Sequence, residues 1–97
     1  MSTPKMYVLV RRDLAETYRC VQGAHALAQF AVEHPKEFRI WNNNYVIFLG
    51  VRNLIELREW HEKIEGCSLF REPDLDMQPT ALAYYGHGEI FRDLKTA

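Results

Sequence analysis

The sequence predicts one small α/β domain, a four-stranded mixed β-sheet packed by helices. Four short segments are rich in the β-branched and aromatic residues that suit strands, and segments with helical periodicity separate the first three. The expected order along the chain is β-α-(α)-β-α-β-β. Strands that alternate with helices require crossover connections, which give a partly parallel sheet. With 97 residues, the chain has the length of a single domain.

The first strand is predicted over residues 5–12, which contain an unbroken apolar run. Such a run is typical of a strand that is covered on both faces. A helix is expected from about residue 17, with Thr17 as its cap, to about residue 33. His34-Pro35 ends it, because a residue before proline avoids the α conformation. Pro35 is well placed to begin a second, short helix.

The first helix is predicted to be amphipathic. At about 100° per residue, five apolar residues share one side and four polar residues form a narrow stripe on the other. The apolar side consists of Val21, Ala24, Leu27, Ala28 and Ala31, and the polar stripe of Tyr18, Gln22, His25 and Gln29. A helix that follows a charged strand end, and carries Gln and His one turn apart, is a common location for a site in α/β folds.

The second half of the chain contains the remaining elements. A strand is predicted over residues 45–51 and a helix over residues 54–64, with Asn53 as its cap and Gly66 just past its end. A third strand over 67–71 and a fourth over 80–85 are joined by an acidic loop at 72–79, so these strands should be neighbours. Residues 5–90 are expected to form the domain and residues 91–97 a C-terminal tail, with Ile90 and Phe91 available to pack on the body.

Composition limits the class of protein. Hydrophobic residues make up 47% of the chain, enough for a small core, and the net charge of −1 does not indicate a nucleic-acid partner. No apolar run approaches the roughly 18 residues that a membrane span requires. Cys20 and Cys67 lie far apart without metal-type spacing and are interpreted as buried thiols rather than a disulfide. We therefore expect a cytoplasmic protein without a membrane segment.

Several segments together resemble the type 2 peptidyl-tRNA hydrolase family. The resemblance rests on the strand end Val10-Arg11-Arg12-Asp13-Leu14 and on Gln22-Gly23-Ala24-His25-Ala26 in the first helix. It continues through the predicted strand 46–51, the helix 53–64 and the strand start Thr80-Ala81-Leu82-Ala83. In the same order as in the family, these segments cover most of the chain, from about residue 5 to residue 86.

The resemblance implies an enzyme that cleaves the ester between a peptide and its tRNA, without a metal or organic cofactor, on a fold that is often a homodimer. Its site would lie at the start of the first helix, beside the loop before the last strand. By position, Gln22 and His25 match the helix residues of the family, Asp13 its strand-end aspartate and Thr80 its strand-start threonine.

The chain departs from the family pattern at two places. Tyr18 stands where the family has a lysine implicated in activity, and the Lys-Gly-rich loop before the helix is replaced by the shorter Ala15-Glu16-Thr17. The acid of the family's loop corresponds to Glu72 or Asp74. Because a phenol carries no positive charge at neutral pH, we predict lower activity than in a typical family member.

Ester cleavage requires a base for the attacking water and donors for the oxyanion. His25 is the candidate base, since its unperturbed pKa lies near neutrality. Glu72 or Asp74 would orient His25 or act in its place, and Gln22, Arg12 or backbone amides would supply donors. Asp13, Tyr18 and Arg19 are further candidates for contacting the substrate. Alternatively, Gln22 and His25 only tie the helix to neighbouring backbone.

Three functions therefore remain open on the sequence alone. The first is hydrolysis of peptidyl-tRNA or a related aminoacyl ester, and the second is a binding module of the same fold that has lost its catalytic set. The third is a hydrolase that acts on a small molecule. A metal site formed by Glu72, Asp74 and Asp76 is not expected, because no calcium-loop pattern follows them, and the four histidines lack zinc-type spacing.

Overall fold

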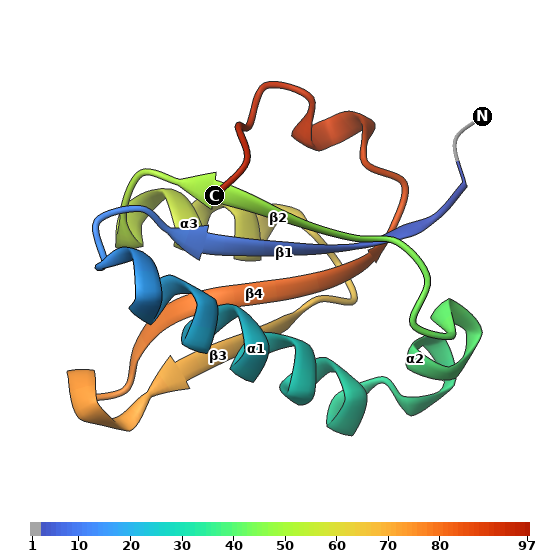
Figure 1. Ribbon diagram of the computed structural model, residues 1–97, viewed down its shortest axis with the longest axis horizontal. Coiled ribbons are helices and arrows are strands. Elements are labelled where there is room, and N and C mark those ends of the chain that lie inside the picture. Colours follow the sequence, from blue (N-terminus) through green and yellow to red (C-terminus); the bar gives the residue numbers. More distant parts are fainter. Residues whose placement is uncertain (1–2) are drawn as a thin grey trace.

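The computed structural model describes residues 3–97 and confirms a small α/β domain with a four-stranded mixed sheet (Figure 1). The strands are β1 (Lys5–Arg11), β2 (Val46–Val51), β3 (Ser68–Glu72) and β4 (Gln78–Gly86). Their order across the sheet is β2-β1-β4-β3. β1 runs parallel to β2, and β4 is antiparallel to both β1 and β3. The expectation that the last two strands are neighbours is thus confirmed.

Three helices cover the two faces of this sheet. α1 (Glu16–Glu33) and α2 (Pro35–Trp41) lie on one face, and α3 (Leu54–Lys63) lies on the other (Figure 1). Short 3-10 turns, η1 (Pro73–Leu75) and η2 (Glu89–Phe91), precede and follow β4. The parallel pair β1–β2 is connected through α1 and α2, as a crossover requires.

β1 is the central strand of both cores. Its residues from Met6 onward are buried, because helices cover the sheet on both sides. Side chains alternate between the faces, so Met6, Val8 and Val10 pack beneath α1, whereas Tyr7 and Leu9 pack beneath α3. The prediction of a strand covered on both faces is confirmed.

The helix ends follow local sequence signals in most cases. Asn53 caps α3 as predicted, its side chain accepting a hydrogen bond from the Glu56 amide at 3.0 Å. Pro35 is the first residue of α2, and Asn42 ends that helix in the left-handed conformation. The prediction for Thr17 is wrong, because α1 starts at Glu16 and the N-cap position belongs to Ala15, which makes no side-chain cap.

The predicted apolar side of α1 does not face the sheet. Instead, Gln22, Gly23, Ala26 and Phe30 are buried. Val21 is 49% exposed, and Ala24 and Ala28 are also exposed, whereas Leu27 and Ala31 are half-buried. The helix is rotated relative to the prediction because an aromatic ring, Phe30, and the hydrogen-bonding partners of Gln22 lie on the sheet side.

The C-terminal tail packs against the α3 side of the molecule. Phe91 is buried and lies 5.1 Å from the rings of both Tyr7 and Trp60, measured between centroids, whereas Ile90 is 48% exposed. Farther along, Thr96 forms an isolated antiparallel bridge with Leu49, so the chain end lies on the outer edge of β2 (Figure 1). No helix within residues 3–97 is long and apolar enough to cross a bilayer.

Candidate active site

Gln22 connects α1 to the two strands that flank the acidic loop. Its Nε2 donates to Oε1 of Glu72 at 2.8 Å, and its Oε1 accepts a hydrogen bond from the Thr80 hydroxyl at 2.5 Å. Gln22 and Thr80 have no exposed surface, and Glu72 is only 8% exposed. Both ends of the amide are therefore satisfied inside the protein, and its orientation is fixed.

A β-bulge directs Thr80 toward this helix. Phe70 pairs with Ala81, but the next residue, Arg71, pairs with Pro79, so Thr80 is the extra residue of β4. A bulge lets two successive residues face the same side of a sheet. Thr80 consequently points to α1 beside Ala81, which belongs to the core on that face.

The carboxylate of Glu72 is held in its charged form. The hydrogen bond from Gln22 is the main cause that lowers its pKa, and the backbone amide of Asp74 adds a second at 3.1 Å. Burial opposes these two hydrogen bonds, and the phenol of Tyr18 and the imidazole of His25 lower the pKa of Glu72 further by smaller amounts. A carboxylate with a lowered pKa is a weak base, so Glu72 acts here as a fixed negative charge.

His25 lies at the protein surface above this charge. Its ring stacks on Phe70, with the centroids 4.4 Å apart and the planes within 5° of parallel. Phe70 and Glu72 are two residues apart in β3, which places their side chains on the same face of the sheet. The stacking therefore positions an exposed imidazole close to the Glu72 carboxylate.

Tyr18 is a further neighbour of Glu72 and is half-buried. Partial burial is the main cause that raises the pKa of its phenol, and the charge of Glu72 and a hydrogen bond to that carboxylate raise it further. The phenol is thus neutral at physiological pH with its proton directed to Glu72. Asp74 contributes its backbone amide, while its side chain is exposed.

Asp13 and Arg11 fix the end of β1 beside Thr80. Arg11 donates to the Asp13 carboxylate at 3.0 and 2.8 Å, which is the main cause that lowers the pKa of Asp13. The same guanidinium reaches Gln78 Oε1 at 2.9 Å and the Pro79 carbonyl at 3.2 Å. Asp13 thus has a structural contact through Arg11, outside the group around Glu72.

Arg12 and Arg19 lie on the opposite flank of α1. Arg19 donates to the carbonyl oxygens of Leu14 and Arg12, both at 2.7 Å, and so holds the loop before the helix. Arg12 is exposed and extends over β2. Neither belongs to the group around Glu72.

Of the predicted site residues, five therefore form one group, which consists of Tyr18, Gln22, His25, Glu72 and Thr80, with the Asp74 amide at its edge. Sequence reasoning missed Phe70. Its position two residues before Glu72 was the available signal, because alternate residues of a strand share a face. Within residues 3–97, no cluster of three or more His, Cys, Asp or Glu side chains is arranged to hold a metal ion.

No protein-family model matches the chain, and no curated protein is similar to it in sequence. Among solved structures, the chain is similar to the protein of unknown function Atu0240 from Agrobacterium tumefaciens strain C58. The similarity covers 100% of this chain and 99% of that protein, with a TM-score of 0.63 and 15% sequence identity. At this identity the comparison establishes a shared fold.

Proposed function

We propose that the protein is an ester hydrolase of the peptidyl-tRNA hydrolase type, with the group around Glu72 as its active site. The supporting observation is that Gln22 is hydrogen-bonded to Glu72 and Thr80, which lie 50 and 58 residues farther along the chain, beneath an exposed histidine. A buried polar network next to a surface imidazole is the arrangement that a general base and its orienting partners require.

In this proposal His25 removes a proton from water, and the resulting hydroxide attacks the carbonyl carbon of the ester. Glu72 stabilises the imidazolium that forms, since opposite charges attract strongly where the carboxylate is shielded from solvent. The tetrahedral intermediate then expels the ribose oxygen, to which the imidazolium returns its proton. The products are a peptide carboxylate and a tRNA with a free hydroxyl group.

Gln22 and Thr80 are positioning residues in this scheme, because neither has exposed surface that a substrate could touch. They keep Glu72 charged and correctly placed. Phe70 has the same role for His25. No cofactor takes part, and an enzyme with this substrate would work in the cytoplasm, where peptidyl-tRNA arises.

A second candidate function is a binding module with the same fold. It is favoured by the fully satisfied amide of Gln22 and by the engagement of the Tyr18 phenol with Glu72, which leave few donors for an oxyanion. In this case the exposed His25 and its surroundings would recognise a partner without cleaving it.

Release of peptide from an N-blocked aminoacyl-tRNA by the purified protein distinguishes the hydrolase from the binding module. We expect cleavage that His25→Ala reduces by a factor of about 10²–10⁴, the usual contribution of a general base. His61→Ala is the matched control, because His61 is an exposed histidine on α3, across the sheet. Absence of cleavage at high protein concentration, or equal rates for His25→Ala and the natural protein, would exclude the hydrolase and favour the binding module.

A further inference from the structure

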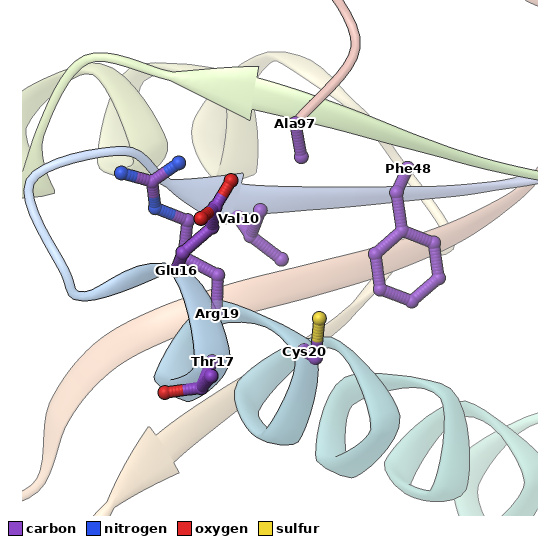
Figure 2. A pocket seen from close by; sticks show the side chains of 7 residues that line it. All are labelled: Val10, Glu16, Thr17, Arg19, Cys20, Phe48 and Ala97. Atoms are coloured by element: carbon purple, nitrogen blue, oxygen red, sulfur yellow. The ribbon is translucent and has the colours of Figure 1, made fainter.

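A cavity of about 510 Å³ lies on the flank of α1 that faces away from Glu72. α1 covers mainly β4, β3 and β1, so that β2 extends beyond the helix (Figure 1). The cavity lies between α1 and β2 (Figure 2). Its apolar wall consists of Val10, Cys20, Phe48 and Ala97, and the Ala97 amide donates to the Phe48 carbonyl at 3.2 Å (Figure 2). Its volume is within the range of sites for small ligands, and it lies toward the carboxyl ends of two parallel strands.

Phe48 provides a rigid aromatic surface in this cavity. A Cβ atom at Gly23 would lie 2.3 Å from Cε2 of Phe48, so the ring rests directly on the backbone of α1 at the glycine. The ring is half-buried and borders the cavity opposite the Cys20 sulfur (Figure 2). A fixed, partly open aromatic face is suited to stacking against a planar ring.

The first turn of α1 contributes polar side chains to the cavity. Glu16 and Thr17 are both exposed in the first turn of α1; the carboxylate of Glu16 offers oxygen acceptors, whereas the Thr17 hydroxyl points away from Cys20 and Phe48 (Figure 2). Arg19 also lines the cavity, but its guanidinium is engaged by two backbone carbonyls. These residues favour a planar ring that bears N–H donors, such as a base with an exocyclic amine.

A cation lies next to the aromatic surface. Cβ at Gly50 would be 2.5 Å from Cδ of Arg12, so only a glycine allows the stem of this arginine to lie flat on β2. Gly50 is two residues beyond Phe48 on the same side of the strand, a separation of about 7 Å. Among the described residues, none forms an ion pair or hydrogen bond with the Arg12 side chain.

The surroundings of Arg12 are suited to an anion. A groove of about 230 Å³ beside Gly50 is bordered by Arg12, Arg52 and Lys95. Its two acids are Glu56, which is bonded to Arg52 at 3.2 Å, and Asp93. Three positive and two negative side chains border the groove, so one net positive charge remains there, beside the strand position that lies about 7 Å from Phe48.

We propose that this face binds a nucleotide, with the base stacked on Phe48 in the cavity and the phosphate on Arg12. The site is separate from the group around Glu72, and its occupancy does not depend on hydrolysis. Both a free mononucleotide and the terminal nucleotide of an RNA chain carry the required base and phosphate.

Amide chemical shifts of the isotope-labelled protein would be followed during titration with AMP, adenosine and a trinucleotide ending in CCA. We expect AMP to shift the signals of Cys20 and Phe48 in a saturable manner and to bind about tenfold more tightly than adenosine, as one charge-assisted hydrogen bond predicts. Tighter binding of the trinucleotide than of AMP would show that the site takes the end of an RNA chain. Equal binding of the two would show that it takes a free nucleotide.

Substitutions test the phosphate half of the site, and alkylation of Cys20 tests the base half. Arg12→Gln and Gly50→Ala should each bring the affinity for AMP down to that for adenosine, whereas Arg58→Gln, an exposed arginine on α3, should leave it unchanged. Bound AMP should also slow alkylation of the exposed Cys20 thiol but not of Cys67, a readout that requires no substitution. Absence of saturable shifts up to about 10 mM AMP, or an unaltered preference over adenosine in Arg12→Gln, would overturn the proposal.

Discussion

Gln22 Nε2 lies 2.8 Å from Glu72 Oε1, and this hydrogen bond joins the middle of the first helix to the end of the third strand. The bond determines two properties of the molecule. It keeps a nearly buried carboxylate ionised, and it places a polar amide on the side of α1 that packs against the sheet. Stability and the proposed chemistry therefore depend on the same contact.

Gln22→Met should destabilise the protein even though the side-chain volume is similar. The substitution leaves the buried Thr80 hydroxyl without its acceptor, which costs about 1–3 kcal/mol of the free energy of unfolding. Urea unfolding measures the change. Gln29→Met is the control, because Gln29 lies on the same helix and its hydrogen bond to Glu33 is exposed. Equal losses in the two variants would contradict a special role of the buried amide.

The stability of the protein should depend on pH through Glu72. Because folding lowers the pKa of this carboxyl below its unfolded value near 4.3, its contribution is present above that value and is lost as pH falls through the folded pKa. The free energy of unfolding of the natural protein should therefore decrease more steeply below about pH 5 than that of Glu72→Gln.

Acid titrations of stability for the natural protein, Glu72→Gln and Glu37→Gln would test this expectation. Glu37 is an exposed carboxyl on α2 and controls for the loss of one negative charge. Asp13 and Glu56 also have lowered pKa values and give a slope of the same sign, but they are common to all three proteins. Parallel curves for the natural protein and Glu72→Gln would rule out the contribution.

Gly23→Ala should destabilise the protein, although alanine normally favours a helix by about 1 kcal/mol over glycine. The added methyl group would overlap the Phe48 ring at 2.3 Å, and overpacking of this kind costs about 1–3 kcal/mol. The double variant Gly23→Ala/Phe48→Leu should recover much of the loss, since the smaller side chain vacates the space. Thermal unfolding of the four proteins in this cycle gives the interaction energy, and strict additivity would contradict direct contact.

Tyr18→Lys should increase the rate of ester cleavage. An ammonium group beside Glu72 adds a positive charge at the proposed site, and removal of a comparable oxyanion donor typically costs a factor of 10² or more, so a gain of about tenfold or more is expected. Thr17→Lys, at the exposed neighbouring position, controls for the added charge. An unchanged rate in Tyr18→Lys would show that the tyrosine is not what limits activity.

Much of the architecture was accessible from the sequence because it depends on local signals. The apolar runs predicted all four strands, and Asn53 and Pro35 marked helix starts through their own backbone preferences. Strand ends were less accurate: β4 begins at Gln78 rather than at residue 80 and β3 ends at Glu72, because pairing between the strands extends both beyond their apolar cores. Cys20, expected to be buried, is exposed because it lies on the open flank of α1.

The sequence by itself determined the strand order along the chain, the helices and the candidate residues Gln22, His25, Glu72 and Thr80, because these follow from residue type and spacing. Only the tertiary structure decided which side of α1 is buried. Polar and small residues on that side are accommodated when a distant carboxylate and hydroxyl satisfy them, and no periodicity along one segment records such partners. The β-bulge at Thr80, the stacking of His25 on Phe70 and the position of Arg12 over Gly50 were likewise decided by contacts between residues that are remote in the sequence.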